Sequence, residues 1–193
     1  EAMVSMLFTA MATGLLFAKF AMPTSRVRFS RTAVIGNHNG ERTLIFRMAN
    51  ERSNQIVEAN INVVIIRSEQ TLEGESLRRF YDLPLRRSQS PVFSLGWTAY
   101  HSIKEDSPLA GATAESLAAM EAVILVSLSG TDSTLWQSVY ARHAYSWSEI
   151  EFDRRFVDLV QVRPDGSRMI DYSDFHMTMP DEDRGADVAS LVG

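Results

Sequence analysis

The chain has 193 residues and a formal net charge of −5, and 45% of its residues are hydrophobic. A mildly acidic chain lacks the basic face that nucleic-acid binding requires, so we expect no nucleic-acid partner. The absence of cysteine excludes a disulfide scaffold and a cysteine-based metal site. The apolar share is enough for one sizeable core, which indicates a globular domain.

The first feature along the chain is an apolar run at residues 3–18 that contains no charged side chain. As a helix it would span about 24 Å, short of the roughly 30 Å hydrocarbon core of a bilayer. A signal peptide would begin with positive charge, whereas this chain begins with Glu1. A buried core helix and the end of a truncated membrane helix both remain. The basic residues that follow favour the membrane helix, because such residues mark its cytoplasmic end. They are Lys19, Arg26, Arg28 and Arg31.

From residue 27 onward, short β-type runs alternate with turn signals. Asn39-Gly40 predicts a hairpin turn, with a strand directly after it at residues 43–48. A Pro-Asp-Gly turn at residues 164–166 is expected between a strand at 156–162 and one at 168–170.

Two further segments complete the expected core. Residues 123–128 form an apolar run that only Ser127 interrupts, which predicts a strand buried on both faces. Thr113 is placed to cap a helix at residues 114–122. Many short strands and one short helix predict a mainly β chain folded as a β-sandwich. Residues 181–193 are acidic and rich in small side chains, so we expect a disordered tail there.

The strand expected at residues 56–67 has two distinct faces. Its apolar side chains recur at every second residue, which places them together against the core. The polar side chains alternate with them and face water or a polar partner. The expected core face is Val57, Ala59, Ile61, Val63 and Ile65, and the expected polar face is Glu58, Asn60 and Asn62.

Signals for catalysis are weak. The sequence has no Gly-x-Ser-x-Gly elbow, no Walker-type glycine loop and no His-Glu-x-x-His motif. A hydrolase using His101 or His143 would require one of these imidazoles to meet a nucleophile in a pocket. The simpler interpretation is that both histidines pack or form hydrogen bonds at strand ends. We therefore expect no enzyme, no metal site and no cofactor.

A set of short segments carries a family likeness when the segments are taken in order. They are GLLFAKFAMP at 14–23, FSRTAVI at 29–35, TLIFRMAN at 43–50, QIVEA at 55–59, DSPL at 106–109, ARHAYS at 141–146, FVD at 156–158 and IDYSDFH at 170–176. Together they resemble the inward-rectifier potassium channels over about residues 13–179. The segment around His143 resembles the bacterial branch.

The resemblance implies an immunoglobulin-like β-sandwich on the cytoplasmic side of the cell inner membrane. It also implies a homotetramer around an extended pore for K⁺, which we group with the voltage-gated channels. Residues 1–20 would be the C-terminal part of the pore-lining transmembrane helix and 21–26 a membrane-interface linker. Residues 27–180 would be the cytoplasmic domain.

The resemblance also implies two gates. Phe17 matches the hydrophobic residue at the helix-bundle crossing, where four such side chains can gate by dewetting. Residues 130–133 occupy the position of the loop that forms the apex constriction of the cytoplasmic pore. This position assigns Gly130, Thr131 and Asp132 to the second gate.

Further expected roles concern the pore wall and the membrane face. Glu58 matches the acidic residue that faces the cytoplasmic pore, and Asn60 and Ser129 are expected beside it. A carboxylate ring attracts cations, so polyamines and Mg²⁺ are expected as pore blockers. Lys19 and Arg26 match basic positions near the anionic-lipid site, which makes membrane lipid an expected partner.

The sequence also departs from the family pattern. Met22 stands where the family usually has a basic residue, and Thr24 and Ser25 stand where animal members add lysines. Ser129 stands where strongly rectifying members carry an acid. We therefore expect neither phosphoinositide activation of the animal type nor strong polyamine rectification.

The chain contains no Thr-Val-Gly-Tyr-Gly filter, pore helix or outer helix, and we expect it to be a piece of a longer channel. The alternative is a soluble immunoglobulin-like interaction module whose N-terminal helix is buried. Size in detergent would separate the two, because a channel should be a tetramer and a module a monomer or dimer.

Overall fold

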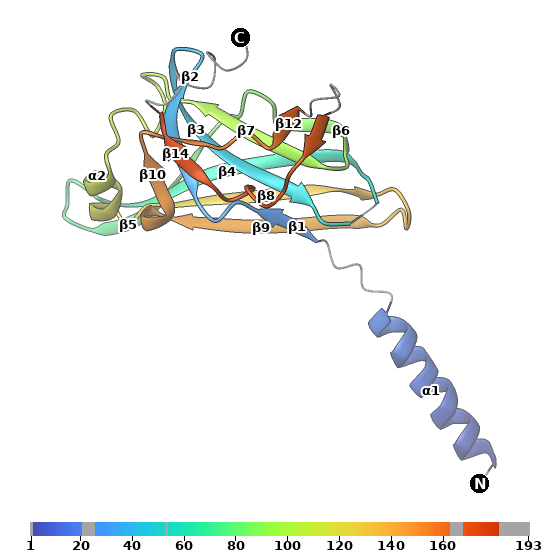
Figure 1. Cartoon of the computed structure of the whole chain (residues 1–193). Coiled ribbons are helices and arrows are strands. Elements are labelled where there is room, and N and C mark those ends of the chain that lie inside the picture. Colours follow the sequence, from blue (N-terminus) through green and yellow to red (C-terminus); the bar gives the residue numbers. More distant parts are fainter. Residues whose placement is uncertain (1, 21–25, 53, 163–167, 182–193) are drawn as a thin grey trace.

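Two sheets face each other across the core of the computed structural model, which describes residues 2–20, 26–52, 54–162 and 168–181 (Figure 1). The first sheet consists of β1 (Val27–Phe29), β2 (Ala33–His38), β3 (Glu41–Asn50), β7 (Gly96–Ser102) and β10 (Ile150–Phe152). The second consists of β4 (Ile56–Gln70), β5 (Ser76–Asp82), β6 (Gln89–Phe93), β8 (Val123–Asp132) and β9 (Ser138–Ser146). This arrangement confirms the expected mainly β sandwich.

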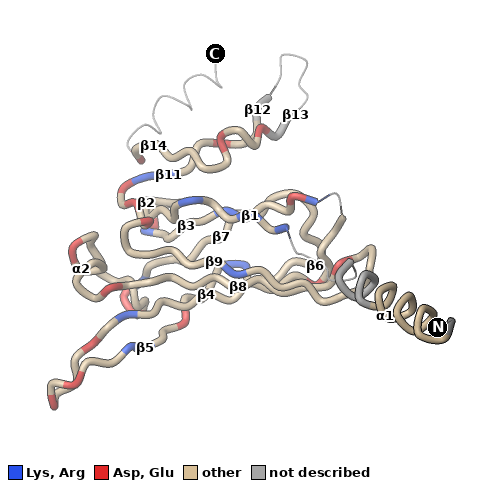
Figure 2. Tube along the Cα trace, turned by 90° about the horizontal axis from the view of Figure 1, so that it is seen from below, with Lys and Arg blue, Asp and Glu red and all other residues tan. Residues whose placement is uncertain are grey.

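Pairing within the sheets is antiparallel except for the β2–β10 pair, which is parallel. In the second sheet β4 is central, because β5, β6 and β8 all pair with it. Figure 2 shows β4 and β5 extending together beyond the rest of the sandwich as a hairpin. Smaller elements complete the fold: α2 (Ala114–Ala119), the 3-10 helix η1 (Trp147–Glu149), and the pairs β11 (Arg154–Phe156) with β14 (Thr178–Pro180) and β12 (Val160–Val162) with β13 (Arg168–Ile170).

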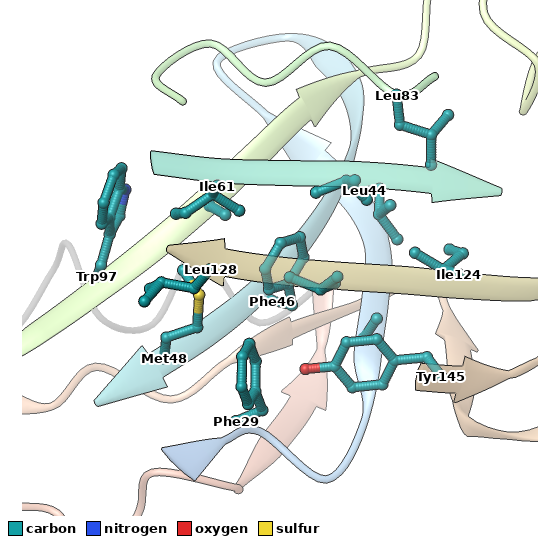
Figure 3. Close-up of a cluster of buried hydrophobic side chains, with 14 of the residues drawn as sticks. Phe29, Leu44, Phe46, Met48, Ile61, Leu83, Trp97, Ile124, Leu128 and Tyr145 are labelled. Atoms are coloured by element: carbon teal, nitrogen blue, oxygen red, sulfur yellow. The ribbon is translucent and has the colours of Figure 1, made fainter. Parts of the chain in front are cut away.

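The core consists of the inward-facing side chains of both sheets (Figure 3). Phe46 from β3 and Tyr145 from β9 are fully buried and lie with ring centroids 6.0 Å apart. The buried Tyr145 hydroxyl forms a hydrogen bond of 3.0 Å with the Ser30 hydroxyl. Burying side chains of this size stabilises a fold by about 1.5–3 kcal/mol each, before the loss of conformational entropy.

The helix α1 (Ala2–Phe20) lies apart from the sandwich core. Its apolar side chains are exposed, including Met3 at 80% and Phe8 at 75%. The alternative of a buried N-terminal core helix is therefore wrong for this chain. Within the described residues, no helix combines the length and the apolar character needed to cross a bilayer.

Several local predictions are confirmed. Asn39 and Gly40 have φ angles of 54° and 79°, which is the left-handed pair of a tight hairpin turn between β2 and β3. Thr113 caps α2, and its hydroxyl accepts a hydrogen bond from the Ser116 amide. The helix ends at Ala119, three residues earlier than predicted, because the chain turns at Glu121 with a φ of 47°.

Two predicted strands differ from the structure. In β8 the side chains of Ile124, Val126 and Leu128 are buried, but Val123 and Leu125 are only half-buried, so one face alone is packed in the core. The strand predicted at 156–162 is divided into β11 and β12. The division occurs where the Asp158 carboxylate accepts a hydrogen bond from the Val160 amide and forms a turn.

The C-terminal predictions fall partly outside the described residues. Residues 164–166 lie there, although β12 and β13 on either side are paired antiparallel. Of the tail predicted at 181–193, only Asp181 is described. Its carboxylate accepts a hydrogen bond of 2.6 Å from the Asn37 amide, so this first residue is anchored to the sandwich.

Candidate functional site

Polar side chains line the outer face of the second sheet at one end. Glu58, Asn60 and Asn62 are exposed on β4, and Asn60 pairs directly with Ser129 of β8. Directly paired residues lie on the same face of a sheet, so the structure brings Asn60 and Ser129 together as predicted. Glu58 is joined to this pair through Asn60, because both line the same hollow. This hollow of about 380 Å³ is lined by Glu58, Ala59, Asn60, Gln89, Ser90 and Pro91.

A β-bulge sets the position of Glu58. The β4–β8 register shifts between Val57 and Asn60, so Glu58 and Ala59 lie opposite the single residue Gly130. Glu58 takes a φ of 51°, the left-handed conformation of the extra residue. The bulge also reverses the alternation, because Ile56 is buried at 2% and Val57 is only half-buried. The prediction that Val57 lies on the core face is therefore wrong.

Gly130 is the residue that makes room for this bulge. A Cβ at position 130 would lie 2.5 Å from Cγ2 of Ile56, 3.1 Å from the carbonyl oxygen of Val57 and 3.3 Å from Cα of Ala59. Any residue larger than glycine at position 130 would therefore displace the bulge. Gly130 lies within β8, so its close backbone approach is to β4.

The turn between β8 and β9 begins later than predicted. Gly130, Thr131 and Asp132 are all in strand β8, and residues 133–137 form the turn. We call residues 133–137 the apex turn. Its exposed apolar side chains are Leu135 at 54% and Trp136 at 76%. The prediction that residues 130–132 are loop residues is wrong, because β8 continues pairing with β9 through Thr131.

The side chain of Asp132 stabilises the apex turn through hydrogen bonds. Its carboxylate is buried at 2% exposure and accepts hydrogen bonds from the Thr134 amide at 2.7 Å and the Leu135 amide at 3.1 Å. The Asn54 side-chain amide donates to its other oxygen. Burial would raise the pKa of Asp132, but these three donors outweigh burial and hold the pKa below its ordinary value.

A basic corner lies where β1 begins. The Arg26 side chain is exposed, and the Arg26 carbonyl accepts a hydrogen bond of 2.9 Å from the Glu51 amide. Arg28 forms a 2.6 Å ion pair with Glu51. The Arg31 amide donates to Nδ1 of His176 at 3.2 Å. Burial and then the nearby Arg31 and Arg28 cations lower the pKa of His176, which keeps its imidazole neutral.

Two predicted residues, Phe17 and Lys19, lie in α1, but their side chains fall outside the described residues. The structure therefore places neither the helix gate nor the first lipid-contact residue.

His101 is a structural residue. It is buried at 2% exposure, with Nδ1 2.7 Å from the Pro84 carbonyl and Nε2 2.8 Å from the Ser107 hydroxyl. Burial lowers its pKa, so the ring is neutral and can bridge the two groups. The Ser107 hydroxyl also accepts from the Leu109 amide, which ties it to its own turn. The imidazole therefore joins the segment before β6 to the turn after β7.

His143 packs among aromatic rings. It stacks on Phe29 with centroids 5.2 Å apart and meets Tyr145 edge-on at 4.5 Å. Burial lowers the pKa of His143, in agreement with this apolar setting. Across the described part of the chain, no group of three or more His, Asp or Glu side chains could hold a metal ion.

Comparison with known proteins settles the family. Residues 27–185 match the family described as the inward rectifier potassium channel C-terminal domain. The chain belongs to this family. Because the inward rectifiers are channels, the chain is not an enzyme of the hydrolase type considered above. The grouping with voltage-gated channels is wrong, since the matched family and relatives are inward rectifiers.

Individual relatives agree with the inward-rectifier family. The chain is 45% identical over 176 residues to the inward rectifier potassium channel Kirbac3.1 of Paramagnetospirillum magnetotacticum, which covers 91% of the chain and 60% of that protein. It is 33% identical to inward rectifier potassium channel 4 of Homo sapiens, over 92% of the chain and 41% of that protein. The G protein-activated inward rectifier potassium channel 3 of Homo sapiens is 31% identical, over 92% of the chain and 47% of that protein.

The chain thus spans about 40–60% of the length of these curated relatives. A solved β-glucuronidase of Bacteroides uniformis overlaps 62% of the chain with a TM-score of 0.21 and 12% identity, a likeness too weak to carry an argument.

Three residues that lie beside the candidate site residues were not singled out from the sequence. Gln89 of β6 shares the hollow with Glu58, and Leu135 and Trp136 are displayed on the apex turn. Gln89 reaches the hollow because β6 pairs with β4, and this pairing joins residues far apart in the chain. The sequence around Gln89 therefore gives no indication of its position. The Asp-Ser-Thr sequence at 132–134 is a turn signal that could have moved the predicted loop toward Leu135 and Trp136.

Proposed function

We propose that four copies of this chain form the gating region and ion vestibule of a K⁺ channel in the bacterial inner membrane. The observation that carries the proposal is the exposed Glu58 carboxylate beside Asn60 and Ser129, on a hollowed sheet face of an inward-rectifier domain. The sandwich would lie on the cytoplasmic side, and the polar faces of the four copies would surround one axis.

The vestibule would act electrostatically. Four Glu58 carboxylates around an axis would raise the local concentration of K⁺, since a wall of one charge sign attracts counter-ions. The same ring would attract polyamines and Mg²⁺ as blockers. The amide and hydroxyl oxygens of Asn60 and Ser129 offer further contacts for a hydrated cation.

The second gate would be at the apex turn. Leu135 and Trp136 are exposed there, whereas the carboxylate of Asp132 is buried and can only hold the turn. A ring of apolar side chains can close a pore by dewetting, so we assign the constriction to residues 133–137. Gly130, Thr131 and Asp132 would support the constriction from β8.

The helix α1 would line the membrane end of the same pathway. The large apolar side chains in the described part of this helix are exposed in the single chain, so they require lipid or neighbouring helices as partners. We propose that Phe17 forms the helix gate and that Lys19 and Arg26 contact anionic lipid.

K⁺ flux into liposomes tests the helix gate in a channel in which this chain continues a pore that carries a selectivity filter. Phe17→Ala should raise the flux, because it removes the apolar ring. Phe8→Ala is the matched control, since nine residues at about 100° each place Phe8 on the opposite side of the helix. Equal flux in the wild type and in Phe17→Ala would show that Phe17 is not the gate.

Particle size in detergent tests the assembly. The proposed channel region requires a tetramer, whereas an immunoglobulin-like interaction module would be a monomer or dimer that needs no detergent. The exposed apolar surface of α1 favours the first outcome.

A further inference from the structure

The apex turn is connected to the turn between β3 and β4 by a small set of hydrogen bonds. The Ser133 amide donates to the Gln55 carbonyl at 2.9 Å, and the Gln55 amide donates to the Ser133 hydroxyl at 3.3 Å. The Asn54 side-chain amide donates to the buried carboxylate of Asp132. Two turns that are far apart in sequence are therefore joined at one point.

Asp132, the last residue of β8, forms several hydrogen bonds with the apex turn. Besides the two amides that its carboxylate accepts, its backbone amide donates to the Gln137 carbonyl and its carbonyl accepts from the Trp136 amide, each at 2.8 Å. Trp136 takes a φ of 51°, which is unfavourable for a bulky side chain. This conformation persists only where surrounding contacts hold it, and Asp132 supplies them.

Asn54 is held in turn by the end of β3. The Asn50 side-chain amide donates to the Asn54 carbonyl at 2.7 Å. The next residue, Glu51, is bound through its amide to Arg26 and through its carboxylate to Arg28. A continuous series of contacts thus runs from the first residues of the domain to the apex turn.

We propose that Asn54 is a positioning residue for the apex turn, because its hydrogen bond to Asp132 fixes the conformation that displays Leu135 and Trp136. The inference rests on the proposed function, in which this turn is a constriction of the pore. It adds a second element, the β3–β4 turn, whose position sets the constriction.

The chemistry of the pair gives a specific set of variants. Asn54→Asp places two carboxylates face to face, and Asn54→Leu keeps the shape but removes the donor. Asp132→Asn should be nearly silent, because its oxygen can still accept from the Thr134 and Leu135 amides, and the Asn54 amide can rotate to accept from its nitrogen. Asn54→Asp combined with Asp132→Asn restores one donor and one acceptor, whereas Asn54→Leu with Asp132→Asn restores nothing.

Amide hydrogen exchange of the full chain tests the contact. We expect exchange at Thr134 and Leu135 to accelerate about 5- to 150-fold in Asn54→Asp and Asn54→Leu, the range for an unpaired buried polar group. The Asn54→Asp, Asp132→Asn double variant should return close to the wild-type rate. Asn39→Asp is the matched control, since it makes the same substitution in an exposed turn. Unchanged exchange in Asn54→Asp, or no return in the double variant, would overturn the proposal.

K⁺ flux through a channel carrying the same variants tests the role in gating. The flux should change in Asn54→Asp and return in the double variant, which a general loss of stability would not produce. If exchange changes but flux does not, Asn54 does not position a gate and the proposal is overturned. A wild-type channel without any flux would instead contradict the proposed function. In that case the exchange rates would still test whether the Asn54–Asp132 hydrogen bond stabilises the apex turn.

Discussion

The two ends of the second sheet differ on their outer faces. At the end with the β-bulge, the outer face carries the polar side chains of Glu58, Asn60 and Ser129. At the other end, the same face carries Val64 and Ile66 of β4, both half-buried, and Phe80 of β5, exposed at 66%. One strand, β4, therefore contributes a polar surface and an apolar surface that follow one another along its length.

The difference shows how a local irregularity creates a site. At the regular end, period-two alternation decides which side chains face the core. At the bulged end, the extra residue Glu58 turns its carboxylate outward and brings Ile56 into the core in place of Val57. This change depends on Gly130 in another strand, so the site is a property of the β4–β8 pair.

The largest expected effect on stability is a difference between the core face and the outer face of β4 at its regular end. Ile65→Ala should lower the free energy of unfolding by about 2–5 kcal/mol, because Ile65 is fully buried and its loss leaves a cavity. Ile66→Ala on the outer face should lower it by about 1 kcal/mol. Urea unfolding of both variants measures the difference. Equal losses would show that Ile66 is as tightly packed as Ile65.

A second substitution addresses the bulged end. Gly130→Ala should lower the free energy of unfolding by about 1–3 kcal/mol, because the new Cβ would lie 2.5 Å from Ile56 and crowd the bulge. Gly96→Ala is the matched control in β7, where the nearest atom would be at an ordinary 3.8 Å. The same urea titration compares them. A Gly130→Ala variant as stable as Gly96→Ala would contradict the packing argument.

The Glu58 carboxylate should matter for cations and little for folding. Glu58→Gln should leave the free energy of unfolding within about 0.5 kcal/mol of the wild type, as is usual for exposed positions. Glu58→Gln should also weaken the block of K⁺ flux by spermine or Mg²⁺ about 10-fold, because it removes one negative charge from the vestibule wall in each of the four copies. Glu75→Gln, in the exposed β4–β5 hairpin, is the control. Equal block in both variants would place Glu58 away from the ion path.

The smallest expected effect concerns pH. The folded state lowers the pKa of His143 below its ordinary value of 6.5, so the unfolded chain binds protons more readily. The contribution of His143 to stability is complete above about pH 6.5 and is lost as the pH falls toward the lower folded pKa. His143→Phe should therefore lose less stability between pH 7.5 and pH 5 than the wild type. Identical pH profiles would show that His143 does not contribute.

The regular parts of the fold were predictable from local sequence. The Asn39-Gly40 turn and the Thr113 cap each depend on one or two neighbouring residues, and the structure has both. The polar side chains of Glu58 and Asn60 were also assigned to the correct face. Which of Ile56 and Val57 faces the core was not predictable from β4 alone. The β-bulge that decides it requires a residue without a Cβ in the neighbouring strand, Gly130.

The apex turn shows the same limit. Gly130 resembled a loop glycine, but its role is close contact between two strands, and the turn begins after Asp132. A glycine in a sequence signals either a turn or a close approach, and only the pairing partner decides between them. The acidic residue Asp132 likewise resembled a pore residue, whereas its carboxylate is buried and accepts hydrogen bonds from two backbone amides of the apex turn.

Distances between identical positions in the assembled protein test the central proposal most directly. The chain has no cysteine, so Asn60→Cys and Leu72→Cys each give a single site for a spin label. Four copies around an axis require two distances for each label, in the ratio of the diagonal of a square to its side. The Asn60 distances should be shorter than those from Leu72, which lies fully exposed at the β4–β5 hairpin. A single distance, or Asn60 labels farther apart than Leu72 labels, would contradict a vestibule lined by this face.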